Sequence, residues 1–205
     1  MKKIFATLAA LVLSAPLFAQ FSSGGFKLDE EHLYYGVRFG VTSATISGDK
    51  EAEASGAKAG MTLGGVVGIK LTSSAPVFLE SGLYFTQRGG KGGVDKRDVR
   101  INHLEIPLLV KYGIQATDEI AVIPFFGPYF SWGIGGKTKI EGSKHSSFND
   151  GLYNHPDMGF KLGCGAEYNN LYLELGYQIG VANISNTDDF TAHGNAFIAN
   201  FGVNF

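Results

Sequence analysis

The sequence is poor in the residues that build several common kinds of site. It has a single cysteine, Cys164, so neither an internal disulfide nor a multi-cysteine metal site can form within the chain. Cys164 is expected to be a small apolar residue on a strand face. Charged residues make up 18% of the chain and the net charge is −2, without the basic excess of nucleic-acid-binding proteins. No nucleophile elbow, zinc motif or phosphate-binding loop occurs, and no catalytic residue, metal site or cofactor is predicted.

Long apolar runs are also scarce, and the one near the N-terminus, Ile4–Leu13, is too short to span a bilayer as a helix. Two lysines precede it and small residues ending in Ala19 follow it. This succession predicts a secretory signal peptide over residues 1–19 and export of the rest of the chain. No cysteine lies near the cleavage point, so lipid attachment there is not expected. Residues 20–33 are polar and predict an irregular N-terminal lead-in.

The stretch Asn102–Ile114 shows the pattern that most of the chain repeats. Large apolar residues occupy every second position, and His103, Glu105 and Lys111 lie between them. This two-residue period predicts a two-faced β-strand, long enough to cross a membrane at a tilt. Pro107 cannot donate a hydrogen bond to a neighbouring strand, so a bulge or a local break is expected there.

The same alternation predicts eight strands and no helix. They are Tyr34–Ile46, Ala59–Leu71, Val77–Arg88, Asn102–Ile114, Ile120–Gly135, Asp157–Tyr168, Leu171–Val181 and Asn195–Phe205. Long connections, at residues 47–58, 89–99, 136–156 and 182–194, alternate with short ones, as in outer-membrane barrels. The predicted fold is therefore all-β, an eight-stranded antiparallel up-and-down transmembrane β-barrel over residues 34–205. Pro124 and Pro128 predict irregular hydrogen bonding in the fifth strand.

Residue size decides which face points inward. An eight-stranded barrel is only wide enough inside to be filled by side chains, and the apolar phase carries too many large residues to fit there. The opposite phase is rich in glycine and holds nearly every charge within the strands. A soluble lipocalin-like carrier, which would turn its apolar face inward, is therefore disfavoured. The predicted lumen polar network comprises Arg38, Lys70, Glu80, Arg88, His103, Glu105, Lys111, Asp157, Lys161, Glu167 and Glu174.

Ion pairs are expected to cross this lumen, because buried charges need partners. If the turn at residues 72–76 centres on Ala75, Lys70 and Glu80 oppose each other directly. We predict a filled interior and no open channel.

Three segments resemble the PorT-like outer-membrane β-barrel family of Gram-negative bacteria. They are His103–Tyr112 (HLEIPLLVKY), Gly127–Tyr129 (GPY) and the last strand, which ends in Phe205. The architecture is also similar to small barrels of the OmpX and OmpA type. The resemblance implies a location in the cell outer membrane, and for PorT itself a link to protein secretion. The terminal FIANFGVNF is similar to the signal read by the barrel assembly machinery, which would be carried by Phe197, Phe201, Val203 and Phe205.

Two groups of residues are candidates for chemistry. His103 and Glu105 share the lumen face, with Tyr129 expected nearby, and an acid and a base so placed could transfer a proton; a structural role in the lumen network is the favoured interpretation. His145, Asp150 and His155 share the longest loop, where a weak metal or ligand site competes with simple solvation.

The remaining features indicate a role at the membrane surface. Aromatic girdles at the membrane interfaces are expected from Tyr34, Tyr35, Tyr112, Trp132 and Tyr177. Mixed charges on the long loops, at Lys50, Glu51, Glu53, Lys91, Asp95, Lys96, Arg97 and Asp98, offer surfaces for an unknown ligand or protein partner. We therefore expect a non-enzymatic outer-membrane protein, in contact with outer-membrane lipid, that acts in binding or envelope structure through its external loops. A secretion accessory and a rim-site lipid or peptide hydrolase are the alternatives.

Overall fold

The computed structural model describes residues 33–49, 54–92, 97–140, 143–148, 153–186 and 191–205. The predicted signal peptide, residues 1–19, and all of the predicted lead-in except Leu33 lie outside these residues. Within the described part of the chain, no helix is long and apolar enough to cross a membrane.

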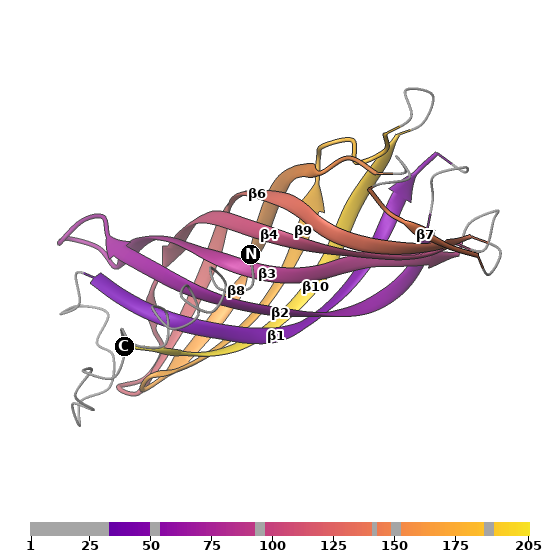
Figure 1. Ribbon diagram of the computed structural model, residues 1–205. Coiled ribbons are helices and arrows are strands. Elements are labelled where there is room, and N and C mark those ends of the chain that lie inside the picture. The colour runs from indigo at the N-terminus through magenta and orange to yellow at the C-terminus, as the bar shows by residue number, and fades with distance from the viewer. Residues whose placement is uncertain (1–32, 50–53, 93–96, 141–142, 149–152, 187–190) are drawn as a thin grey trace, which may run out of the picture.

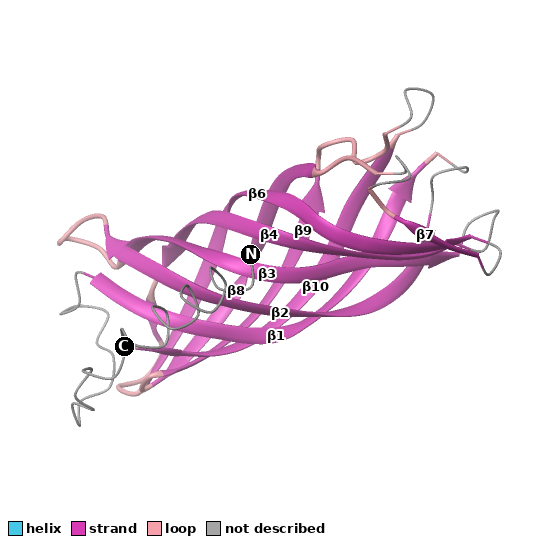
Figure 2. Ribbon diagram, viewed as in Figure 1, coloured by secondary structure: helices cyan, strands magenta, loops and turns pink. Residues whose placement is uncertain are grey.

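Eight long strands form one closed antiparallel ring (Figures 1 and 2). They are β1 (Leu33–Gly48), β2 (Ala54–Lys70), β3 (Val77–Gly92), β4 (Arg97–Tyr112), β6 (Ile120–Ile140), β8 (Pro156–Tyr168), β9 (Leu171–Gly180) and β10 (Ala192–Asn204). Each of these eight strands pairs with the next one along the chain, including β4 with β6. Pairing of β1 with β10 closes the ring. Two short strands, β5 (Ile114–Gln115) and β7 (Ser143–Ser146), pair with β6. The predicted eight-stranded barrel is confirmed.

The two ends of the barrel differ in their connections. At one end the strands are joined by residues 71–76, 113–119 and 169–170, and we call this the turn end. At the other end lie the longer connections, and we call this the loop end. The chain enters β1 and leaves β10 at the turn end (Figure 1), as an even number of strands requires.

The wall has its apolar face outside. Strand β9 shows the alternation without interruption, exposed and buried at every second residue. Large hydrophobic residues such as Phe39, Leu63, Phe126 and Leu173 are more than half exposed, whereas the charged residues of the same strands are buried. The predicted polarity is confirmed. Leaving that much apolar surface in water would be unfavourable, so the barrel is built for a lipid surrounding.

Several strands run further at the loop end than the sequence pattern predicts. The predicted loops at residues 47–58 and 89–99 are largely strand, since β2 begins at Ala54 and β3 continues to Gly92. The cause is that the outward positions of these extensions are polar, for example Lys91 and Arg100. Without an apolar outer face, the two-residue period that indicates a strand becomes hard to see.

Prolines interrupt the hydrogen bonding on both sides of β4. At Pro107 the β3–β4 ladder omits two pairs without changing register, and the Ser81 hydroxyl donates to the Pro107 carbonyl oxygen at 2.8 Å. The β4–β6 ladder omits two pairs at Pro128 in the same way. The predicted local break at Pro107 is confirmed. The register shift of β4 lies elsewhere, between Asn102 and His103.

Glycines on the inner face allow aromatic rings to lie against the barrel wall. A Cβ added at Gly68 would lie 2.2 Å from the Tyr34 ring, and one at Gly165 would lie 2.3 Å from the Tyr172 hydroxyl oxygen. Tyr34 is therefore buried inside the barrel, and its predicted place in an outer aromatic girdle is wrong. Strand alternation explains the correction, because Tyr34 has the same phase as Arg38.

A charge placed at the middle of the outer face should be costly. Leu175 lies halfway along β9 and is about half exposed. We expect Leu175→Arg to lower the free energy of unfolding by about 2–4 kcal/mol, as at a bilayer midplane. The measurement is urea unfolding of the barrel in phospholipid vesicles. Asp118→Arg, in a turn-end connection, is the matched control and should cost under about 1 kcal/mol. Equal losses in the two variants would contradict the proposed lipid-facing band.

Candidate functional site in the barrel lumen

Buried charges form one cluster near the turn end. Its members are Arg38 on β1, Glu80 on β3, Lys111 on β4 and Glu174 on β9, and we call it the turn-end ion cluster. The Lys111 ammonium lies 2.8 Å from Glu80 Oε1 and 3.5 Å from Glu174 Oε2, and Arg38 Nη2 lies 3.5 Å from Glu80 Oε2. Because β4 and β9 are not neighbours, the contact between Lys111 and Glu174 runs across the lumen.

Neutral side chains add hydrogen bonds to the turn-end ion cluster. Tyr34 donates to Glu80 at 2.7 Å, and Tyr172 donates to Glu174 at 3.0 Å. The Arg38 guanidinium also lies 4.2 Å from the centre of the Tyr172 ring, in a cation–π contact. Each carboxylate is thus held by both a cation and a hydroxyl donor, which is what makes buried charges tolerable.

A second cluster lies nearer the loop end. It consists of Arg88 on β3, Glu105 on β4, and Asp157 and Lys161 on β8, and we call it the loop-end ion cluster. Arg88 Nη1 lies 3.0 Å from Asp157 Oδ2, and Glu105 pairs with both Arg88 and Lys161. Gln178 on β9 adds a hydrogen bond to Glu105 at 2.8 Å. This cluster also joins strands that are not neighbours.

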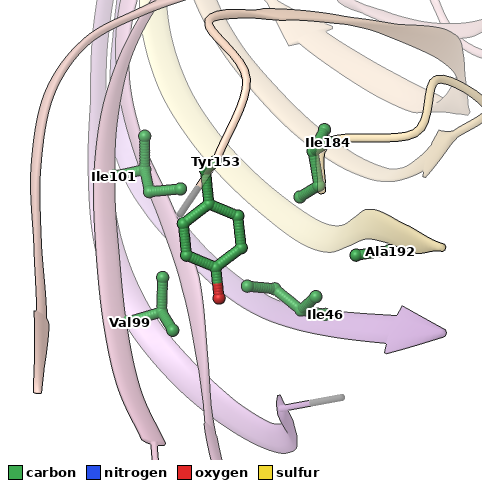
Figure 3. Packing of buried hydrophobic residues seen from close by; sticks show 6 residues of the cluster. All are labelled: Ile46, Val99, Ile101, Tyr153, Ile184 and Ala192. Atoms are coloured by element: carbon green, nitrogen blue, oxygen red, sulfur yellow. The ribbon is translucent and has the colours of Figure 1, made fainter. Parts of the chain in front are cut away.

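Apolar residues cover the clusters on both sides. At the turn end, Tyr34, Phe78, Ala121, Ile123 and Tyr172 form a buried group, the turn-end cap, in which the Tyr34 and Phe78 rings meet edge to face at 5.9 Å. At the loop end, a second group forms the loop-end cap (Figure 3). Its members are Ile46, Val99, Ile101, Tyr153, Ile184 and Ala192.

The loop-end cap brings residues of the connections into the barrel mouth. Tyr153 comes from the connection between β7 and β8, and Ile184 from the connection between β9 and β10. Figure 3 shows both within the cap, with the Tyr153 ring extending toward Val99 and Ile46. The two connections are joined by backbone, since the Asn154 amide donates to the Ile184 carbonyl oxygen at 2.9 Å and Tyr153 forms a β-bridge with Ser185. The cap is therefore a folded part of the structure.

Asp49, just after β1, is hydrogen-bonded to Thr191 in the connection between β9 and β10. Its carboxylate accepts hydrogen bonds from the Thr191 amide at 2.8 Å and the Thr191 hydroxyl at 3.0 Å. These donors favour the charged form and lower the pKa of Asp49 below its ordinary value. The contact links the end of β1 to the segment that enters β10.

His103 lies between the loop-end ion cluster and the loop-end cap. It is buried, and its Nδ1 atom has no hydrogen-bond partner within the described part of the chain. It borders a cavity of about 20 Å³ together with Arg88, Asp157 and Ile101. Such a cavity holds about one water molecule, far too little for a substrate.

Ten of the eleven residues predicted for the lumen network are buried in the structure. Lys70 is only half-buried at the end of β2. Its predicted pairing with Glu80 is wrong, because the register sets Lys70 opposite Phe78 and Gly68 opposite Glu80. The turn therefore centres on Ser74 rather than on Ala75, and a shift of one residue changes which residues face each other.

The candidate residues of the longest loop do not form a metal site among the described residues. His155 is stacked between the Phe148 ring, at 4.2 Å, and the Trp132 ring, at 5.6 Å, and its Nδ1 is bonded to the Gly133 carbonyl oxygen. His145 is exposed on β7. Asp150 lies outside the described residues.

Sequence reasoning missed the loop-end cap. Tyr153 and Ile184 lie in connections that read as polar, and neither belongs to a periodic run. The signal that was available is a few large apolar residues scattered through two otherwise polar loops. It indicates burial only once the two loops are known to lie over the same barrel mouth.

Comparison with known proteins agrees with this geometry. A profile of the family described as "Outer membrane protein beta-barrel domain" matches residues 18–186. Neisserial surface protein A resembles the chain with a TM-score of 0.52 and 16% identity, over 85% of this chain and 98% of that chain. The Ail protein of Yersinia pestis gives a TM-score of 0.46 and 12% identity over 85% and 100%, and OprG of Pseudomonas aeruginosa gives 0.44 and 13% over 84% and 95%. No curated protein sequence matches significantly.

Removing one partner of the loop-end ion cluster should destabilise the barrel. We expect Glu105→Ala to lower the free energy of unfolding by about 3–5 kcal/mol, because it leaves the buried Lys161 ammonium without its carboxylate. The double variant Glu105→Leu with Lys161→Met should lose clearly less free energy of unfolding, because neither charge is left unpaired and Arg88 still forms its ion pair with Asp157. Urea unfolding in detergent micelles measures both, with the exposed Glu119→Ala as control. A double variant as unstable as Glu105→Ala would contradict the explanation that the single variant is destabilised by an unpaired Lys161.

Proposed function

This chain belongs to the outer membrane protein β-barrel domain family, and we propose that it is a non-conducting barrel that works through the surface at its loop end. The protein is located in the cell outer membrane, as the family match and the fold indicate. Barrels of this kind carry short turns on the periplasmic side and longer loops outside. The loop end would therefore face the exterior of the cell.

The observation that carries this proposal is the filled lumen. Four layers follow one another along the barrel: the turn-end cap, the turn-end ion cluster, the loop-end ion cluster and the loop-end cap. A solute crossing the barrel would have to break buried ion pairs and displace two apolar groups. Transport through the lumen is thus disfavoured, which leaves the two ends and the outer face as working surfaces.

The loop end is the better candidate of the two ends. Its connections are tied to each other and to the barrel through Tyr153, Ile184 and the Asp49–Thr191 contact. Residues on the outer side of these connections would then be presented on a rigid base, which lowers the entropy cost of binding a partner. A role in binding or in envelope structure fits such a platform.

The alternative functions rest on weaker observations. The resemblance of His103–Tyr112 to the PorT-like family supports a secretion accessory, which would use the same loop-end surface. A hydrolase using His103 and Glu105 has little support: Glu105 already pairs with Arg88 and Lys161, and His103 lies beneath the cap. We propose no enzymatic role for them.

Export and assembly would use the two termini. The proposed signal peptide covers residues 1–19. On β10, Phe197 and Phe201 are exposed on the outer face, as is Phe205 just beyond the strand, while Val203 is half-buried between them. This outward aromatic row is available to the barrel assembly machinery before the β1–β10 seam closes, as a C-terminal assembly signal would require.

A closed lumen predicts the absence of ion conduction. The purified barrel, reconstituted in a planar bilayer, should give no discrete conductance steps, because both ion clusters and both caps close the path. Stable single-channel steps from the protein alone would overturn the proposal of a filled, non-conducting barrel.

Removing the two side chains that anchor the connections in the loop-end cap should impair function without unfolding the barrel. In the double variant Tyr153→Ala with Ile184→Ala, the connections lose their anchor while the ion clusters remain. Cells with this variant should behave like cells lacking the protein in assays of detergent sensitivity and surface attachment, at an unchanged amount of folded barrel. Asp118→Arg at the turn end is the control and should behave like wild type. Normal behaviour of the cap variant would contradict a function at the loop end.

A further inference from the structure

A group of basic residues gathers on the outer face at the loop end, where β3, β4 and β6 extend together beyond the middle of the barrel (Figure 1). Lys91 on β3, Arg100 on β4, and Lys137 and Lys139 on β6 are all exposed; we call them the basic patch. The strand ladders bring them together, because Asp98 lies opposite both Lys91 and Lys139, and Arg100 lies opposite Lys137.

The strand register sets two of these charges against each other. Arg100 lies directly opposite Lys137 in the β4–β6 ladder. Side chains at directly opposite positions have Cβ atoms about 5 Å apart, and like charges placed so are destabilising. The pair therefore carries a cost that an anion bound between the two side chains would remove.

The nearby acid does not neutralise the patch. On the described loop-end extensions of β3, β4 and β6, the acidic residue is Asp98, which lies opposite Lys91 on one side and Lys139 on the other. Its carboxylate forms an ion pair with the buried Lys58. The four exposed cations thus keep an excess of positive charge.

The basic patch lies at the edge of the apolar outer band. Along β4 the outward residues change from Ile106 and Leu104 to Arg100, and along β6 they change from Trp132 and Ile134 to Lys137. Tryptophan is enriched where a bilayer meets water. In a bilayer that covers the apolar band, the cations would lie at the depth of the lipid headgroups.

An apolar groove follows the same strands into the band. It has a volume of about 330 Å³, and its walls include Ile106 and Leu108 on β4, Pro128 and Phe130 on β6, and Phe160 on β8. Ile106 lies six positions after Arg100, about 20 Å along a strand. On a tilted strand, an acyl chain that spans half of the ~30 Å hydrocarbon core would reach this groove from the headgroup level.

From these observations we propose that the basic patch and the groove form a binding site for a phosphate-bearing lipid of the outer leaflet. Arg100 and Lys137 hold the phosphate between them, Lys91 and Lys139 add positive charge, and the groove takes part of an acyl chain. Arginine suits this role because its guanidinium bonds phosphate oxygens in pairs. A soluble polyanion could use the cations but would leave the groove empty, so we assign the site to a lipid.

The one tryptophan of the chain reports on this site. Trp132 is about half exposed beside the patch, so bromine atoms on a nearby acyl chain quench its fluorescence. The full-length barrel is reconstituted in vesicles of phosphatidylcholine, and quenching by brominated phosphatidic acid is compared with quenching by brominated phosphatidylcholine. The wild type should prefer the phosphatidic acid. Arg100→Gln with Lys137→Gln should reduce that preference about tenfold or more, given the effect of each basic residue on anionic-lipid binding.

Two further variants distinguish a specific lipid-binding site from a general attraction of anionic lipids to basic residues. Lys137→Arg keeps the charge and should keep the preference, and Lys70→Gln removes a cation at the opposite end and should leave it unchanged. Equal quenching by the two lipids in the wild type, or an undiminished preference in the double variant, would overturn the proposal. It would also be overturned if soluble inositol hexakisphosphate bound through Arg100 and Lys137 while no lipid preference was found. These results are independent of the conductance measurement, so either proposal can fail alone.

Discussion

The structure depends on one steric constraint, the narrow interior of an eight-stranded barrel. Side chains alone fill such a space, and the residues that line it must be small or must share the room. Glycines at positions such as Gly68 and Gly165 let Tyr34 and Tyr172 lie flat against the wall. Long cations such as Lys111 and Lys161 then extend across the lumen to acids on non-neighbouring strands, so contacts that fill the space also pair buried charges.

The balance of charge inside the barrel follows from that geometry. Arg38, Arg88, Lys111 and Lys161 meet five buried acids, of which Glu167 is held by a hydrogen bond from Asn204 at 3.0 Å. Removing one partner of an ion pair would leave a buried charge without its counter-charge. This is why the lumen is better described as a network that supports the barrel than as a row of potential catalytic groups.

The loop-end extensions reverse the polarity of the wall. Within the apolar band, polar residues point inward and apolar residues point outward. Beyond it, Val99 and Ile101 point inward under the loop-end cap, while Arg100 and Lys137 point outward. The reversal is physically consistent, because the interior there is closed by the connections and the exterior meets headgroups and water. One strand such as β4 therefore contributes to the ion cluster, to the cap and to the proposed lipid site.

The sequence by itself determined the strand number, the face that meets lipid and the inward position of ten of the eleven residues predicted for the lumen, because these depend on a period of two and on residue size. It could not determine which charges pair. A one-residue difference in the turn at Ser74 moved Lys70 away from Glu80, and contacts such as Lys111–Glu174 join strands far apart in sequence. The loop-end cap, the opposition of Arg100 to Lys137 and the groove beside Pro128 were likewise decided only by the tertiary structure. Closure of the ring sets the register between strands and brings distant segments together. The residue pattern within a single strand predicts neither of these.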